Sequence, residues 1–337
     1  MKRLSRTKKR ILLLYCIAAV LMLGATLSGL LLGSVRLSPK ELFDAAFGGG
    51  RESSAARIFW YVRFPRVAAA LLCGGALALS GAVIQGVLAN RLASPSIVGV
   101  NSGAGLAVTL CAAFGVLGGW RLSACAFLGA FLAVLIISLG AQKWGASRGT
   151  VILMGVALNA LFGAISDSVT VFFPDLAILR NDFKIGDFSA VTYPKLIPAA
   201  AVILVASLLL LLLSGKLDVL TLGEEQARSL GMNTGVMRVI FLILSALLAG
   251  AAVSVAGLLS FVGLLVPHAV RRTAGGNSHL LPLSLLFGAG FVALCDALSR
   301  FLFAPHEIPV GILMAFLGAP FFLFILIKGK GGERLHD

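Results

Sequence analysis

Charged residues are scarce in this chain. Asp, Glu, Lys and Arg together make up 12% of its 337 residues, whereas hydrophobic residues make up 59%. An ordinary soluble domain carries about twice that share of charge, so a single soluble core is excluded. Apolar runs of roughly 20 residues recur, the length that a helix needs to cross the ~30 Å hydrocarbon layer of a membrane. These runs are apolar on every side rather than alternating, which also excludes a membrane β-barrel. The fold class that we expect is an all-α polytopic membrane protein.

Acidic residues are half as frequent as basic ones, 14 against 28, which leaves a formal net charge of +14. In a soluble protein such a surplus would indicate a nucleic-acid partner. Here much of the positive charge lies at the ends of the apolar runs, where it contacts anionic lipid and orients the spans. We therefore expect membrane lipid as a partner, and no nucleic acid.

Motifs for nucleotide binding, metal binding and catalysis are missing. No stretch matches G-x-x-x-x-G-K-[ST], since Gly215-Lys216 lacks the earlier glycine, and no H-E-x-x-H occurs. The five cysteines lie within apolar runs without C-x-x-C spacing, a pattern typical of small buried side chains rather than of metal or redox sites. We expect no cofactor and no catalytic residue. If transport uses ATP, another subunit must hydrolyse it.

What the sequence does contain is a series of ten apolar runs. The first follows a basic segment but exceeds the ~7–15 residues of a signal-peptide core, so we expect it to be retained. An even number of spans puts both termini on one side, and most basic residues between spans fall on that side. This predicts an inner-membrane protein with cytoplasmic termini and one transmembrane domain, 1–337. The eighth run is short and contains Pro267, which leaves its depth open. The runs lie near residues 11–33, 65–86, 95–117, 122–142, 149–171, 192–213, 236–258, 260–273, 281–302 and 309–327.

Two of these runs resemble each other. Residues 71–81 align with residues 247–257, with identical residues at five positions: Leu71, Leu72, Gly74, Ala76 and Gly81. In the ten-span topology the first copy runs inward and the second outward. Such inverted repeats are a common plan for transporters, although small apolar residues also match by chance.

A short charged segment, residues 222–231, interrupts the apolar runs on the basic side. A polar helix held between two spans is a surface that another protein can grip, which favours a transporter driven by a separate subunit. The residues that we expect to carry this contact are Gly223, Glu224, Glu225, Ala227, Arg228, Leu230 and Gly231.

A few polar residues interrupt the spans, where burial is costly. Gln85, Asn101 and Asn159 are candidates for lining a pathway, although interhelical hydrogen bonds are an equally good interpretation. Asp167 and Asp296 are expected towards the outer ends of their spans, where burial is less severe.

Arginines on the outer side depart from the positive-inside rule. Arg63 and Arg66 precede the second span, and Arg300 ends the ninth. Because the guanidinium group grips carboxylates in two parallel hydrogen bonds, these arginines are candidates for docking an acidic extracellular partner. Snorkelling to lipid phosphate is the alternative interpretation.

Several segments together resemble one family, the permease subunits of iron-siderophore and vitamin B12 ABC importers (the FecCD type). The resemblance covers nearly the whole chain, and its most specific parts are Phe-Val-Gly-Leu-Leu-Val-Pro-His and Glu-Ile-Pro-Val-Gly. One departure is Arg91, which stands where the family usually has proline, so the contact of that loop with an ATPase is in doubt. The matching segments are residues 63–66, 74–85, 90–105, 222–231, 257–268 and 307–311.

The resemblance implies a type II ABC importer permease that pairs with a second copy of itself or a close paralogue. It implies that cytoplasmic ATP-binding subunits grip residues 222–231 as a coupling helix. It further implies that acidic residues of an extracytoplasmic substrate-binding protein meet Arg63, Arg66 and Arg300. The hypothesis that follows is import of a ferric siderophore or a related chelate, with vitamin B12 or haem as alternatives. A secondary transporter driven by an ion gradient is the rival from another class, but we find no convincing ionisable residue near the midplane of a span.

Overall fold

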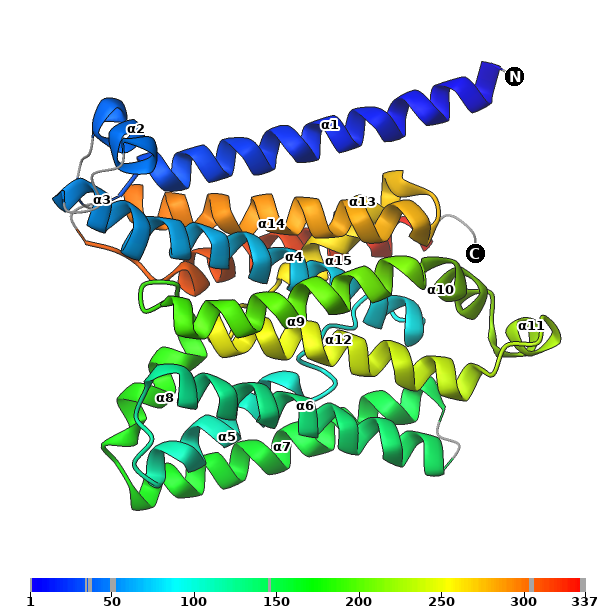
Figure 1. Cartoon of the computed structure of the whole chain (residues 1–337). Helices are drawn as coiled ribbons and strands as arrows, with labels where there is room; N and C mark the ends of the chain where they lie inside the picture. Colours follow the sequence, from blue (N-terminus) through cyan, green and yellow to red (C-terminus); the bar gives the residue numbers. More distant parts are fainter. Residues whose placement is uncertain are drawn as a thin grey trace.

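The structure is a computed structural model that describes residues 2–33, 35, 38–48, 53–144, 147–302 and 306–333. The described part consists of helices joined by turns and loops, and ten of the helices lie at the positions of the ten predicted spans (Figure 1). These ten are α1 (Lys2–Leu31), α4 (Phe64–Val87), α5 (Val100–Ala113), α6 (Gly119–Lys143), α7 (Arg148–Phe172), α9 (Tyr193–Leu212), α12 (Thr234–Ala256), α13 (Val262–Ala274), α14 (Asn277–Phe301) and α15 (Val310–Glu333).

Seven of the spans are long and apolar enough to cross a membrane: α1, the continuous helix that ends in α4, α6, α7, α9, α12 and α14. The expected number of ten is therefore approximate. Helix α5 and the apolar part of α15 are shorter, and α13 has only 13 residues. The sequence leaves the depth of the eighth run open. In the structure this run is α13, a helix about half as long as a full span, with Pro267 inside it.

Shorter helices mark the two ends of the bundle (Figure 1). Helices α2 (Pro39–Phe47), α3 (Ser54–Ile58) and α8 (Leu176–Ile185) lie at one end, with the π-helix η1 (Phe59–Arg63) leading from α3 into α4. Helices α10 (Ser214–Thr221) and α11 (Glu224–Ser229) lie at the other end, as does the N-terminus. We refer to these as the α8 end and the α11 end. At the α8 end, Ser38 begins α2 with a capping box, and its backbone and side-chain hydrogen bonds lower the pKa of Glu41.

Helices α4, α12 and α14 form the core of the bundle. Nearly every residue of α4 is buried, because small side chains let its neighbours approach closely. A Cβ atom at Gly81, for example, would collide with the backbone carbonyl of Gly263 on α13. In contrast, α1, α7 and α9 expose most of their large apolar side chains, the surface that lipid or a second subunit would cover.

The two segments that resemble each other in sequence pack against each other in space. The Ser80 hydroxyl donates to the carbonyl of Ser245 at 2.9 Å, and the Cys73 thiol lies 3.6 Å from the carbonyl oxygen of Ala252. The residue number falls on one helix as it rises on the other, so α4 and α12 are antiparallel.

The inverted repeat extends beyond these two helices. Helices α4 to α7 have 24, 14, 25 and 25 residues, and α12 to α15 have 23, 13, 25 and 24. The second helix of each set starts after a residue in the left-handed region, Gly99 (φ 87°) in one and Phe261 (φ 67°) in the other. A phenylalanine rarely adopts this conformation, and its shared position supports the predicted repeat.

Candidate functional site

Helix α11 projects from the α11 end of the bundle. It occupies the centre of the predicted 222–231 segment, between Gly223 and Gly231. Both glycines have positive φ angles, 120° and 79°, which residues with a side chain rarely adopt. Ala227 is fully buried and anchors the helix, whereas Leu222 and Leu230 on either side of it are 60% and 66% exposed. Large exposed leucines flanking a charged helix form a surface that fits a protein partner.

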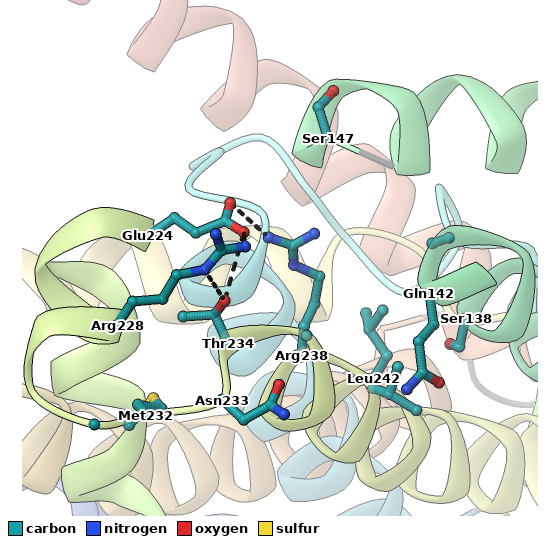
Figure 2. A pocket seen from close by; sticks show the side chains of 14 residues that line it. Ser138, Gln142, Ser147, Glu224, Arg228, Met232, Asn233, Thr234, Arg238 and Leu242 are labelled. Atoms are coloured by element: carbon teal, nitrogen blue, oxygen red, sulfur yellow. Dashed lines mark hydrogen bonds and ion pairs between the residues drawn. The ribbon is translucent and has the colours of Figure 1, made fainter. Parts of the chain in front are cut away.

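Glu224 ties α11 to the first turns of α12. Its carboxylate accepts from Arg228 Nη2 at 2.8 Å and from Arg238 Nη2 at 3.3 Å, and Thr234 Oγ1 lies at 3.4 Å (Figure 2). Arg238 is buried and belongs to the core-facing side of α12. The bonds from Glu224 therefore join the exposed helix to a buried one, so a force on α11 reaches the bundle. Sequence reasoning missed Arg238 and Thr234, because nothing in the linear pattern placed them opposite Glu224.

A cavity of about 750 Å³ opens beside α11. Figure 2 shows Glu224, Arg228 and Arg238 on one side of it, with Ser138 and Gln142 of α6 on the other. The lining combines hydroxyl, amide and guanidinium groups with Met232 and Leu242. Its size and mixed polarity suit a segment of another protein.

The three arginines proposed for docking lie together at the α8 end, as predicted, but they are not exposed. Arg63 is 3%, Arg66 5% and Arg300 3% exposed. The sequence did not predict this burial, and a docking role for the three arginines stays a prediction. They are buried because each guanidinium group is already bonded within the chain, and an unpaired guanidinium would not be buried.

Arg66 contacts three carboxylates. Its Nε donates to Asp296 at 2.9 Å, its Nη1 donates to Glu307 at 2.7 Å, and its Nη2 lies 3.7 Å from Asp187. Arg300 shares Asp296 through an ion pair of 2.9 Å and donates to the carbonyl groups of Gly29 and Leu32 at the end of α1.

Arg63 donates to backbone carbonyl groups at and beyond the end of α1, those of Leu30, Leu31 and Val35. Within the described residues, the cluster thus holds three positive and three negative side chains. It joins α1, α4, the residues after α8, α14 and the residues before α15.

A cavity of about 140 Å³ gives access to this cluster, and Arg63, Arg66, Arg300 and Glu307 all line it. The Nη2 group of Arg66 is buried and has no hydrogen-bond partner among the residues that the structure describes. A carboxylate that reached Arg66 through the cavity could therefore accept a hydrogen bond that Nη2 does not donate to any described residue.

The two aspartates predicted near the outer ends of spans differ in burial. Asp167 has a side chain that is 68% exposed and forms a 2.6 Å ion pair with Arg180, in agreement with a mild environment. Asp296 is only 1% exposed, so the expectation of mild burial is wrong for it. It is buried because two arginines, 66 and 300, balance its charge. Sequence reasoning also missed Asp187 and Glu307, which lie in loops and complete the cluster.

The three candidates for lining a pathway have different surroundings. Gln85 is buried, donates to the carbonyl of Gly263 at 3.2 Å and accepts from Arg271 at 3.4 Å. Asn159 joins α7 to the segment before α5 by donating to the carbonyl of Ser96 at 3.0 Å. Asn101 is half-buried at the start of α5. These bonds agree with the interhelical interpretation for Gln85 and Asn159, and a role in a pathway stays a prediction.

The helix pair α5–α6 brings together two cysteines whose proximity was not predicted. Gly103 and Gly129 lie against each other's backbones, and Ala107 packs on Gly129. One turn farther along each helix, the thiols of Cys111 and Cys125 lie close enough to interact. Among the described residues, no group of three or more His, Cys, Asp or Glu side chains could hold a metal ion.

Comparison with known proteins gives concordant results. The sequence model of the FecCD transport family matches residues 18–328. The chain is 34% identical over 328 residues to the Fe(3+)-citrate import system permease protein of Bacillus subtilis, covering 97% of this chain and 98% of the relative. It is 35% identical over 310 residues to the hemin transport system permease protein of Yersinia pestis, covering 89% and 92%.

A solved structure has the same fold. It is an inward-facing conformation of a metal-chelate type ABC transporter, with a TM-score of 0.82 and 30% sequence identity. The similarity covers 94% of this chain and 99% of that one.

Proposed function

Because the chain belongs to the FecCD transport family, a family of ABC transporter permease subunits, we propose that it carries a ferric siderophore or related metal chelate across the cytoplasmic membrane. The names of two relatives, one for ferric citrate and one for hemin, support a chelated iron compound as substrate. The permease provides the route, and ATP hydrolysis takes place in partner subunits.

The observation that carries the proposal is the pairing of α11 with the 750 Å³ cavity beside it. In this mechanism a cytoplasmic ATP-binding subunit contacts Leu222, Leu230 and the charged side of α11, and fills the cavity. Residues 222–231 then act as the coupling helix, and closure of the ATPase pair moves α11. The Glu224 bonds to Arg228, Thr234 and Arg238 transmit that motion to α12.

This assignment orients the chain in the membrane. The α11 end, with the N-terminus, faces the cytoplasm, and the α8 end faces the outside. Two copies of the chain, or this chain and a close paralogue, enclose the pathway between them. The exposed apolar faces of α7 and α15 supply surface for such a contact. Gln85, Asn101 and Asn159 stay candidates for residues that change partners as the pathway opens.

An extracytoplasmic substrate-binding protein docks at the α8 end. Because the arginines at this end already balance the charge of three carboxylates, they are not a free positive surface for the binding protein. Since the three guanidinium groups are buried, the partner's acidic side chain reaches them through the 140 Å³ cavity and bonds to Arg66 Nη2. Docking is then an insertion rather than a contact between two flat surfaces.

Copurification tests the proposal. Expression of the tagged chain with its neighbouring ATP-binding subunit should yield a stable complex. The double substitution Leu222→Ser and Leu230→Ser should lose that complex, because it removes two large exposed leucines. The matched control is Phe43→Ser with Phe47→Ser, two exposed phenylalanines on α2 at the opposite end of the bundle, and it should keep the complex. Retention of the ATPase by the α11 variant would count against the coupling role.

A further inference from the structure

The end of α8 is fastened to two other helices by backbone hydrogen bonds. The amide of Asp187 donates to the carbonyl of Ala256 at 2.8 Å, and the amide of Leu258 donates to that of Phe183 at 2.9 Å. The amide of Gly311 donates to the carbonyl of Gly186 at 3.1 Å. The turn after α8 therefore bonds to the last residue of α12, the residues after it and the first turn of α15.

This junction is tightly packed. Gly186 has φ 75°, a conformation that favours glycine, and a Cβ atom at Gly311 would collide with the carbonyl of Ile185. Helices α12 and α15 are the first and last helices of the second repeat. A change in the conformation of the turn after α8 would therefore affect both the first and the last helix of that repeat.

Asp187 connects this turn to the buried arginine cluster. Its side chain is 26% exposed and faces Arg66, whose side chain is 6% exposed, across 3.7 Å. Its other carboxylate oxygen accepts from the amide of Ser189 at 3.1 Å. Neither Asp187 Oδ1 nor Arg66 Nη2 has a hydrogen-bond partner among the described residues. The pair is therefore an ion pair without a hydrogen bond.

The three carboxylates around Arg66 are held with different strengths. Asp296 is buried between two arginines, and Glu307 accepts a charge-assisted hydrogen bond of 2.7 Å. Glu307 is slightly more exposed than Asp187, 31% against 26%, but Asp187 has the longest contact with Arg66 and no hydrogen bond to it. A fourth carboxylate entering the cavity would repel all three, and Asp187 is the one that can leave at the lowest cost.

We propose that Asp187 is an exchangeable partner of Arg66, displaced when an acidic side chain of the docked binding protein bonds to that arginine. Displacement removes one of the contacts that hold the turn after α8, so docking loosens the junction of α8 with α12 and α15. The inference rests on the proposed docking function and gives Asp187 the role of a positioning residue that reports the docked state.

Hydrogen exchange of the full permease–ATPase complex in lipid nanodiscs tests this, with the binding protein itself as the probe. In the wild-type complex, addition of the binding protein should raise amide exchange in the segment 183–188 about threefold, the effect of losing one partly exposed ion pair. Asp187→Asn should show the raised exchange without the binding protein and little further increase with it. The control is Asp182→Asn, which changes an exposed carboxylate of α8 and should behave as wild type.

Docking is measured on the same samples by retention of the binding protein on immobilised complex. Unchanged exchange in a wild-type complex that does retain the binding protein would overturn the exchange mechanism, as would wild-type protection in Asp187→Asn. If the wild-type complex retains no binding protein, the docking function fails, and the exchange of Asp187→Asn alone then decides whether Asp187 holds the turn. Asp187→Glu keeps the negative charge and should show the same slow amide exchange as the wild type. This variant distinguishes loss of the charge from a folding defect.

Discussion

Asp296 should be among the most costly carboxylates in the chain to remove. Its side chain is 1% exposed and carries ion pairs of 2.9 Å to both Arg66 and Arg300. Asp296→Asn keeps the shape but removes the charge, which leaves Arg300 buried with only backbone carbonyl partners among the described residues. Loss of one partner from a buried ion pair costs about 3–5 kcal/mol, so we expect the free energy of unfolding to fall by about 3 kcal/mol.

The assay is denaturant unfolding of the purified permease in mixed micelles, followed by tryptophan fluorescence. Asp167→Asn is the matched control, because the Asp167 side chain is 68% exposed, although its partner Arg180 is only 14% exposed. Its 2.6 Å ion pair should contribute ~0.2–1 kcal/mol. The double variant Asp296→Asn with Arg300→Gln removes the orphaned charge as well, so its cost should be smaller than the sum of the two single costs. If Asp296→Asn is as stable as the control variant, the buried ionic cluster does not have the role assigned to it.

Three further predictions concern the two ends of the bundle and the α5–α6 pair. Arg66→Lys keeps the charge but loses the forked geometry of the guanidinium group. The permease–ATPase complex should still assemble, while its affinity for the binding protein weakens roughly tenfold, about 1.4 kcal/mol. Unchanged retention of the binding protein would exclude Arg66 from docking. Replacing Glu224 and Arg228 with alanine should leave ATP hydrolysis measurable but greatly reduce uptake, and normal uptake would count against coupling through α11. Because the thiols of Cys111 and Cys125 lie close enough to interact, a mild thiol oxidant should join them within one chain. Mass spectrometry would show this as the loss of two hydrogen atoms, and two freely alkylated thiols after oxidation would contradict the α5–α6 register.

The sequence predicted most of the fold, because apolar runs and basic flanks are local signals. The ten runs correspond to ten helices, and the match between residues 71–81 and 247–257 predicted an inverted repeat that the antiparallel packing of α4 and α12 supports. The sequence showed that the eighth run is short, but not that Phe261 precedes α13 in a left-handed conformation. That geometry depends on packing against the rest of the bundle.

The candidate sites were predicted unevenly. The segment 222–231 was located correctly as a helix, since its charge contrasts with the runs on both sides. The three arginines lie together at one end of the bundle, as their positions in the predicted spans indicated, but their burial was not predicted. Burial depends on Asp187, Asp296 and Glu307, which are far from Arg66 in sequence and meet it only in the folded bundle. Long-range ion pairs of this kind leave no periodic signal in one sequence.

The central claim is that ATP hydrolysis by partner subunits drives substrate through this chain. Proteoliposomes containing the permease with its ATP-binding subunits, supplied with the binding protein and a ferric siderophore labelled with radioactive iron, test it directly. ATP-driven import predicts accumulation that requires ATP on the α11 side of the membrane and continues when a protonophore collapses the proton gradient. Accumulation that proceeds without ATP and stops with the protonophore would contradict the claim and identify a secondary transporter.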